Sequence, residues 1–499
     1  MLAELKNELN RTLTENGAET YKSTLSDCLD FFATVGALRR ESDGEIIARF
    51  LRAFAEDRDV AVKILFYARD VRGGLGERRV FRLILRWLAQ KAPDTVRKNL
   101  CYVAEYGRFD DLLTLVGTPV QDDLYAYIKD QLESDLRAME NGGEVSLLAK
   151  WLPSVNTSNR DAVAMAKKLA RALQMDDRTY RKTLASLRAH IRILENNLRE
   201  RDYTFDYEKQ PSKAMFKYRQ AFIRNDGERY AAFIRAASEG EAKLHADTLA
   251  PYELVAPYLF DGGTKGFESF MRRTTEEEER VLNATWASLP AFDSSENALA
   301  VIDTSGSMYW DNKPLPAAVA LSLGLYFAEH NHGAFRNHFI EFSSHPELIE
   351  IKGDTFADRL RYVASFNEVA DTNLEAVFDV ILRAAVKNRL SESDLPTKLI
   401  IISDMEFNAC VQGAKQNNFE NAKRKFAAAG YKLPEVVFWN VASRNRQQPV
   451  TANEEGVVLV SGCTPRLFSM VMNGSLDRAT PYHFMMEVIG SARYEKIVA

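Results

Sequence analysis

The sequence predicts two architectures in one chain: an all-helical array, followed by a doubly wound α/β domain. Up to about residue 290, apolar side chains recur at helical spacing in one segment after another, and strand-like alternation is nearly absent. From Ala298 onward, short apolar runs alternate with amphipathic helical patterns, which is typical of a parallel sheet covered by helices. At 499 residues, the chain is also long enough for two or three domains.

In the first part we expect pairs of antiparallel helices, arranged as an array or as a curved solenoid. The clearest pair flanks a glycine-containing turn at 71–79, because helical apolar periods precede and follow it. No strict sequence period is found, so a regular repeat is not established. Further helical patterns cover 94–105, 109–117, 121–140, 161–173, 178–199, 211–223 and 227–238.

The second part is expected to begin with the apolar run 298–302, which suits a buried parallel strand. A similar run at 398–403 ends at Asp404. Around these runs we expect helices near 314–330, 355–364, 374–389 and 417–429, a hairpin-like pair at 337–342 and 347–351, strands at 435–441 and 456–460, and a helix from Pro465.

Oxygen-bearing side chains follow the first apolar run at a spacing of two. Asp303, Ser305 and Ser307 would point to the same side of an extended segment. Thr372 and Asp404 are expected in loops at the carboxyl ends of the strands, at the same edge of the sheet. Carboxylates and hydroxyls are hard oxygen ligands, which favour Mg²⁺, Mn²⁺ or Ca²⁺. The alternative is a serine-rich turn that caps the next helix.

These segments resemble the von Willebrand factor A domain and its metal-ion-dependent adhesion site. Asp303, Ser305 and Ser307 match the first motif of that family, Thr372 the second and Asp404 the third. The resemblance implies that these five residues hold the metal ion directly or through water. It also implies an open coordination position for a carboxylate or phosphate of a partner.

The glycine turn gathers arginines that could grip phosphates through charge-assisted hydrogen bonds: Arg69, Arg72, Arg78, Arg79 and Arg82. A dinucleotide-binding fingerprint is excluded, because no strand precedes the turn and an arginine takes the third glycine position. The alternative is a tight helix-helix turn with solvated arginines.

A polar loop at 150–160 separates two predicted helices. Like the arginines of the glycine turn, it is a candidate contact for nucleic acid. Lys150, Trp151 and Asn156 combine a cation, an aromatic ring and an amide, which suit single-stranded RNA. The alternative is a helix cap, with Trp151 in a helix interface.

Charge and cysteine usage narrow the class of protein. The net charge is −5, and residues 1–290 balance 45 basic against 45 acidic side chains, although 51–100 carries 12 basic against 6 acidic. The four cysteines are scattered, which favours a reducing, cytoplasmic setting over a disulfide framework or a zinc ribbon. The N-terminus does not resemble a secretory signal, no apolar run predicts a membrane span, and no catalytic constellation indicates an enzyme.

A helical array followed by such an A domain resembles the Ro ribonucleoprotein family, which carries a TROVE module. The segment 68–79 is typical of a related TROVE-like family of unknown function. The resemblance implies a HEAT-like helical ring that is closed by the A domain, and structured small RNAs or single-stranded RNA ends as partners. The expected domains are a helical HEAT-like domain at 1–294, an A domain at 295–475 and a C-terminal helix within 476–499 that packs back on the body.

Three functions follow from these patterns. The first is an RNA-binding scaffold of ribonucleoprotein type, with a divalent-metal ligand site in its A domain. The second is a metal-dependent protein-protein adhesion or assembly module without RNA, in which the metal ion grips an acidic protein. The third, a metal-dependent enzyme, lacks a general base near the site.

Overall fold

The computed structural model describes residues 8–191, 193–259, 274–292, 296–309, 314–343, 345–366, 372–408, 418–472 and 479–499. Within these ranges, the first part of the chain is a succession of helices and the last part is a six-stranded sheet flanked by helices. The predicted combination of a helical array and an α/β domain is therefore confirmed. No helix of the described residues has the length and apolarity that crossing a bilayer requires.

The helices of the array follow one another with short connections. They are α2 (Asp27–Thr34), α3 (Asp43–Glu56), α4 (Arg58–Arg69), α5 (Arg78–Lys91), α6 (Pro93–Asn99), α7 (Tyr102–Tyr106), α8 (Phe109–Leu112), α9 (Gln121–Glu140), α10 (Leu148–Trp151), α11 (Arg160–Ala172), α12 (Asp177–Ile191), α13 (Leu194–Glu200), α14 (Ser212–Asn225), α15 (Gly227–Ser238), α16 (Pro251–Val255) and α17 (Glu276–Ala287).

Side-chain caps set where several of these helices begin. Ser42 accepts the backbone N–H of Glu45 at the start of α3, and Asp57 accepts that of Val60 at the start of α4. Asn159 caps α11 in the same way. The apolar stripes then fix how the helices pack, since the buried side chains of α5 recur at helical spacing: Val80, Phe81, Ile84, Leu85 and Leu88.

The sheet has the order β5-β4-β3-β6-β7-β8. All neighbouring pairs are parallel except β4 and β5, which form an antiparallel edge. The strands are β3 (Ala298–Asp303), β4 (His338–Phe342), β5 (Leu348–Glu350), β6 (Lys398–Ser403), β7 (Glu435–Asn440) and β8 (Val457–Ser461). Strand order reverses between β3 and β6, so the carboxyl ends of these two strands border the crevice where open α/β sheets bind ligands.

Helices cover both faces of this sheet, because its strands are apolar on both sides. Side chains of one face, such as Ile302 and Ile400, belong to a core that continues into the helical array, whereas Val301 and Ile401 belong to a separate core on the other face. The flanking helices are α18 (Pro316–His330), α19 (Phe356–Ala364), α20 (Leu374–Asn388), α21 (Asn418–Ala428), α22 (Arg466–Met472) and α23 (Pro481–Ile489).

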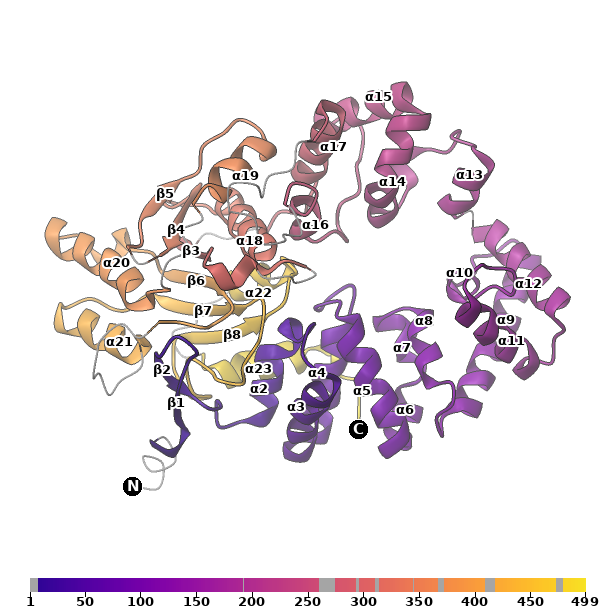
Figure 1. Ribbon diagram of the computed structural model, residues 1–499, viewed down its shortest axis with the longest axis horizontal. Coiled ribbons are helices and arrows are strands. Elements are labelled where there is room, and N and C mark those ends of the chain that lie inside the picture. Colours follow the sequence, from indigo (N-terminus) through magenta and orange to yellow (C-terminus); the bar gives the residue numbers. More distant parts are fainter. Residues whose placement is uncertain are drawn as a thin grey trace.

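Both ends of the helical array pack on the α/β domain, which gives the molecule a ring-like outline (Figure 1). At the first end, α2 packs against β8 and α23. At the other end, α16 packs against α18, and α17 packs against α19. The middle helices, α9 to α14, arch between these two attachments (Figure 1).

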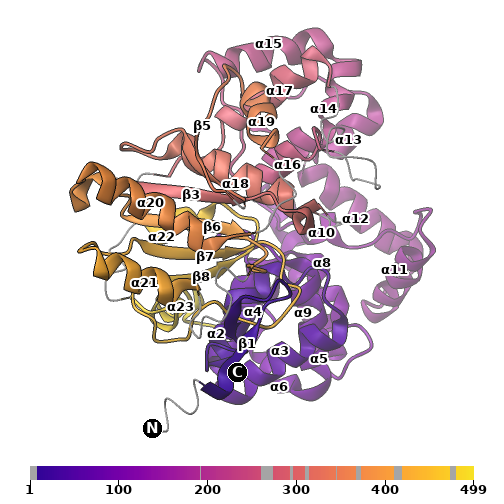
Figure 2. The ribbon, with the colours of Figure 1, turned by 60° about the vertical axis from the view of Figure 1, so that its left-hand side comes forward.

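Several features differ from the sequence-based expectations, among them the helix expected at 94–105, which is divided into α6 and α7. A short antiparallel hairpin, β1 (Arg11–Leu13) and β2 (Glu19–Tyr21), precedes the array and lies beside the α/β domain (Figure 2). Three-residue strands carry too few side chains to show an alternating pattern. In addition, the helix expected at 178–199 is divided into α12 and α13, where Ile193 adopts extended backbone at φ −63° and ψ 135°.

Candidate functional site

The crevice at the switch point of the sheet contains two buried carboxylates. Asp303 is the last residue of β3, and Asp404 follows the last residue of β6. Asp303 is fully buried and Asp404 is 3% exposed. Adjacent parallel strands therefore bring together two acidic side chains that lie 101 positions apart in the sequence.

Hydroxyl groups surround the two carboxylates. Ser305 Oγ and Ser307 Oγ lie 3.2 Å apart, and the backbone N–H of Ser305 donates to Asp303 Oδ1 at 2.9 Å. Ser403 Oγ donates to Asp303 Oδ2 at 2.6 Å. Ser307 lies on a single 3₁₀ turn, Gly306–Tyr309, and hydrogen-bonds to Asp404. The structure thus brings four of the five predicted metal ligands together.

Thr372, the fifth predicted ligand, contacts the loop that carries Asp404. Its Oγ1 lies 2.9 Å from Glu406 O and 2.8 Å from Asn408 Oδ1, and its backbone N–H donates to Asn408 Oδ1 at 2.9 Å. A hydroxyl that donates its one proton in this way keeps its oxygen lone pairs. Thr372 is buried, and the segment before it, 367–371, lies outside the described residues.

Burial of like charges perturbs both acids. Burial, and then the nearby charge of Asp404, raise the pKa of Asp303 to about 7. Burial also raises the pKa of Asp404, although Arg444 and the hydrogen bond from Ser307 act in the opposite direction. A divalent cation held by these residues would offset this repulsion.

The donor set fits a hard divalent ion. Two carboxylates and three hydroxyls supply oxygen ligands alone, which suit Mg²⁺, Mn²⁺ or Ca²⁺. In the described ranges, no three His, Cys, Asp or Glu side chains gather in a way that could hold a metal ion, here or elsewhere, so this candidate site depends on its hydroxyl groups as well as its two carboxylates. Asp303, Ser305, Ser307, Thr372 and Asp404 would hold the ion, which would supply a positive centre for an anionic group of a partner.

The sequence did not predict two charged residues at the edge of this site, Arg444 and Glu15. Arg444 Nη2 lies 3.0 Å from Asp404 Oδ2, and its Nη1 lies 3.3 Å from Glu15 Oε2. Glu15 belongs to the turn of the N-terminal hairpin, which no sequence pattern placed near the sheet. Ser403 could have been found, because it directly precedes Asp404 at the end of a strand.

The glycine turn between α4 and α5 joins the helical array to the C-terminal segment. Arg493 and Tyr494 both contact the buried carboxylate of Asp70, at 2.7 Å from Arg493 Nη2 to Oδ1 and 2.9 Å from Tyr494 Oη to Oδ2. Arg466 of α22 donates to Val71 O at 2.7 Å. A Cβ at Gly74 would lie 2.0 Å from a backbone oxygen of α4, so only glycine fits there. Much of this motif therefore serves domain docking.

The five arginines of this segment do not converge on one surface. Arg69 is buried, with its Nε 2.7 Å from Asp111 Oδ2, and Arg82 pairs with Asp110 and Asp111 at 2.7 and 2.6 Å. Two others are exposed and contact nearby groups: Arg72 donates to Glu105 O, and Arg79 lies 2.5 Å from Asp43. Arg78 is exposed and has no hydrogen bond or ion pair with the described residues.

A basic cavity of about 660 Å³ lies between the glycine turn, α16 and α22. Six lysine and arginine side chains line it, against two acidic ones. Burial and the nearby Arg69 and Arg78 guanidinium groups lower the pKa of Arg108, although Asp110 opposes them. An anion in this cavity would relieve the repulsion. The six basic residues are Arg39, Arg69, Arg78, Arg108, Lys213 and Arg466.

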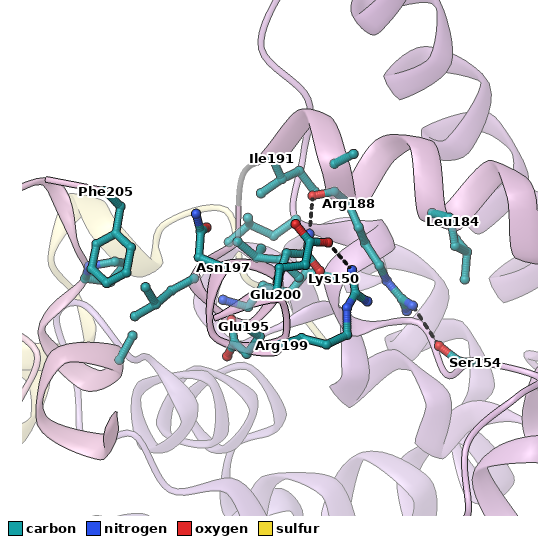
Figure 3. Close-up of a pocket in the computed structure, with 18 of the residues that line it drawn as sticks. Lys150, Ser154, Leu184, Arg188, Ile191, Glu195, Asn197, Arg199, Glu200 and Phe205 are labelled. Atoms are coloured by element: carbon teal, nitrogen blue, oxygen red, sulfur yellow. Dashed lines mark hydrogen bonds and ion pairs between the residues drawn. The ribbon is translucent and has the colours of Figure 1, made fainter. Parts of the chain in front are cut away.

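A larger cavity of about 1250 Å³ lies between α10, α12, α13 and α14 (Figure 3). It also has six basic side chains, against three acidic ones, and both Lys150 and Asn156 line it. Arg188 is held at its wall by three hydrogen bonds, one of them to Ser154 at 2.7 Å (Figure 3). The basic residues are Lys150, Arg181, Lys182, Arg188, Arg199 and Lys209.

Trp151 stands between the two cavities. The Arg108 guanidinium, which lines the smaller cavity, lies 4.2 Å from the centre of its ring, and Lys150 of the larger cavity lies 5.8 Å from it. The ring is half-buried and already holds one cation on its face. Arg108 was missed in the sequence, since a single arginine before Phe109 carries no motif.

Two family models match this chain. Residues 14–131 and 122–291 match the sequence model of a family described as a domain of unknown function, DUF2828. The chain belongs to this family. Residues 297–490 match a second family, also described as a domain of unknown function, DUF7788.

This DUF2828 member has a relative in Acanthamoeba polyphaga mimivirus, the uncharacterized protein L728. The two are 28% identical over 524 residues, covering 96% of this chain and 87% of that protein. Among solved structures, the Ro (RSR) protein of Deinococcus radiodurans is a neighbour, with 14% identity and a TM-score of 0.49. That alignment covers 94% of this chain and 100% of the Ro chain.

Proposed function

We propose that this protein is an RNA-binding scaffold of ribonucleoprotein type, of the TROVE-like class that its sequence resembles. Its α/β part is then a von Willebrand A domain with a divalent-metal ligand site, and its helical part is a HEAT-like ring. RNA is the expected partner, a divalent ion the expected cofactor, and the cytoplasm the expected location. The site binds and does not catalyse.

One observation carries the RNA proposal: basic side chains without acidic partners line both cavities. Lys150, Arg181 and Lys182 in the larger cavity, and Arg78 in the smaller one, form no ion pair with the described residues. Arginines that serve structure alone, such as Arg69, have carboxylate partners. Basic side chains that lack an acidic partner within the protein can bind an external polyanion, and the phosphate groups of RNA supply the negative charge.

Single-stranded RNA suits these cavities better than duplex. Both are recesses that side chains line, and Asn156 offers an exposed amide for hydrogen bonds to a base edge. Half-buried Trp151, and half-buried Tyr252 of the smaller cavity, add apolar surface for bases. The balanced charge of residues 1–290 fits a local basic surface and does not require a basic domain.

The test is ultraviolet crosslinking of the full chain in cell extract, followed by sequencing of the bound RNA. Arg181→Glu/Lys182→Glu should reduce crosslinked RNA about tenfold or more, because the charge reversal repels phosphates. The control is Arg383→Glu/Lys387→Glu, an equal charge reversal on the exposed side of α20 in the α/β domain. Wild-type protein that retains no more RNA than an unrelated protein of similar charge would reject the proposal.

The second candidate is a metal-dependent adhesion module that grips an acidic protein. Its support is the cluster of Asp303, Asp404 and the hydroxyls of Ser305 and Ser307, which are ligands for a hard ion. In affinity capture, this function requires a protein partner that is retained in Mg²⁺ and released by a chelator. The partner should also be lost with Asp303→Asn, and RNase treatment should leave its capture unchanged.

A further inference from the structure

Three segments that are distant in sequence meet at the rim of the candidate metal site. They are the hairpin turn at 14–17, the loop 404–408 after β6, and the loop 441–448 after β7, here called the rim loop. Thr14 Oγ1 donates to Phe407 O at 2.5 Å, and Asn16 Nδ2 donates to Glu406 O at 2.6 Å. Asn445 Nδ2 of the rim loop lies 2.8 Å from Glu406 Oε1 and 3.0 Å from Glu15 Oε1. The hairpin is thus fastened to both loops.

Arg444 of the rim loop lies between two carboxylates with different surroundings. Its Nη2 contacts Asp404 Oδ2 at 3.0 Å, and its Nη1 contacts Glu15 Oε2 at 3.3 Å. The Asp404 side chain is 3% exposed, whereas that of Glu15 is 50% exposed. The same guanidinium therefore joins a buried acid of the metal site to an acid on the solvent side.

Both oxygens of Asp404 accept hydrogen bonds in this arrangement. Oδ1 accepts the backbone N–H of Glu406 at 3.2 Å, and Oδ2 accepts Arg444. A divalent ion that binds Oδ2 must compete with the guanidinium, because two cations on one oxygen repel each other. Glu15 offers the released guanidinium an acceptor that it already contacts.

We propose that Arg444 is the resident cation of the metal site, and that a divalent ion displaces it from Asp404 toward Glu15. This inference rests on the metal site of the proposed function and adds its regulation. Arg444 lowers the affinity for the metal ion, and Glu15 raises it by receiving the guanidinium. Both residues act by position and are not ligands of the ion.

The rim loop also contacts the helical array, so a movement of Arg444 can affect the array. Arg49 of α3, which is 4% exposed, donates to Ser443 Oγ at 3.0 Å and to Asn445 O at 3.1 Å. Arg446 Nε lies 2.6 Å from Glu45 Oε1, also on α3. A shift of Arg444 therefore moves a loop that fastens one end of the array to the α/β domain. Metal loading and the closure of the ring become coupled.

The test is titration of the full-length chain with Mn²⁺ by calorimetry, together with the Mg²⁺-dependent rise in unfolding temperature. Arg444→Gln should bind Mn²⁺ about tenfold more tightly than wild type, and Glu15→Gln about threefold more weakly, since the two changes act on opposite sides of the exchange. Arg383→Gln is the control, because it removes an exposed arginine of the same α/β domain on α20, whose guanidinium contacts only the backbone oxygen of Asp379 among the described residues. It should bind Mn²⁺ within twofold of wild type.

The outcomes separate the inference from the proposed function. If neither wild type nor Arg444→Gln binds Mn²⁺ or gains stability with Mg²⁺, the metal site itself is rejected. If wild type binds but Arg444→Gln binds equally or more weakly, the metal site stands and the role of Arg444 is overturned. Opposite shifts for Arg444→Gln and Glu15→Gln support the exchange.

Discussion

Asp70 and Asp404 are both buried aspartates that meet an arginine from a distant segment, yet their electrostatic settings are opposite. Burial alone would raise the pKa of Asp70, but hydrogen bonds from Arg493 and from two backbone N–H groups of the glycine turn lower it. At Asp404 burial outweighs Arg444, and the pKa is raised. The first acid is fully compensated within the chain, whereas the second remains short of positive charge. A structural ion pair and a candidate metal-binding site thus differ in how completely a buried charge is paired.

Loss of the compensated pair should have the largest effect on stability. Asp70→Asn leaves Arg493 without its carboxylate and weakens the attachment of the C-terminal segment. We expect the free energy of unfolding to fall by about 3–5 kcal/mol, as measured by chemical denaturation. Asp43→Asn, which breaks an exposed pair with Arg79, should cost less than about 1 kcal/mol. Equal losses for the two variants would contradict the distinction.

The backbone that positions Asp70 is the next target. Gly74→Ala places a Cβ 2.0 Å from Tyr67 O, where a backbone oxygen cannot move aside, so the turn must distort. We expect a loss of about 2–3 kcal/mol in the same denaturation experiment. Gly44→Ala is the control, because no atom lies within 4 Å of its added Cβ in α3. It should leave stability unchanged or raise it by up to about 1 kcal/mol.

Asp30 tests a half-buried carboxylate that has neither a bound arginine nor a metal ligand set. It accepts the backbone N–H of Thr24, and burial raises its pKa to about 7. Between about pH 4 and pH 7 the folded chain therefore holds a proton that the unfolded chain releases, so stability falls as the pH rises. Asp30→Asn should remove up to about 4 kcal/mol of this fall, since one pKa unit corresponds to about 1.4 kcal/mol, as measured by the free energy of unfolding against pH. An unchanged slope would show that Asp30 ionises normally.

The smallest effect is expected at an exposed pair. Arg79 contacts Asp43 and the backbone oxygens of Arg39 and Glu41, but both charged side chains are about half exposed. Arg79→Gln should change the free energy of unfolding by less than about 1 kcal/mol, because water screens the pair. A larger loss in the same denaturation assay would show that Arg79 stabilises the fold as strongly as the buried pair at Asp70.

The residues of the site that could be predicted are those that belong to a short sequence motif or follow an apolar run. Asp303, Ser305 and Ser307 share one extended segment, and Asp404 ends an apolar run, so strand recognition brings all four to one edge of the sheet. Arg444 and Glu15 have no such pattern, since each is a single charged residue in a loop or turn. The arginines of the glycine turn show the same limit: spacing places them near each other, but only their partners distinguish buried Arg69 from exposed Arg78.

The sequence by itself determined the succession of helices, the order of strands and helices in the α/β domain, and the acidic and hydroxyl groups at the ends of β3 and β6. These follow from periodicity and from short motifs, which are local properties of a chain. Only the tertiary structure decided that the array returns to the α/β domain, that the glycine turn binds the C-terminal segment through Asp70, and that the N-terminal hairpin reaches the rim of the candidate metal site. These contacts join residues about 400 positions apart, and their energies depend on burial and pairing that no local pattern records.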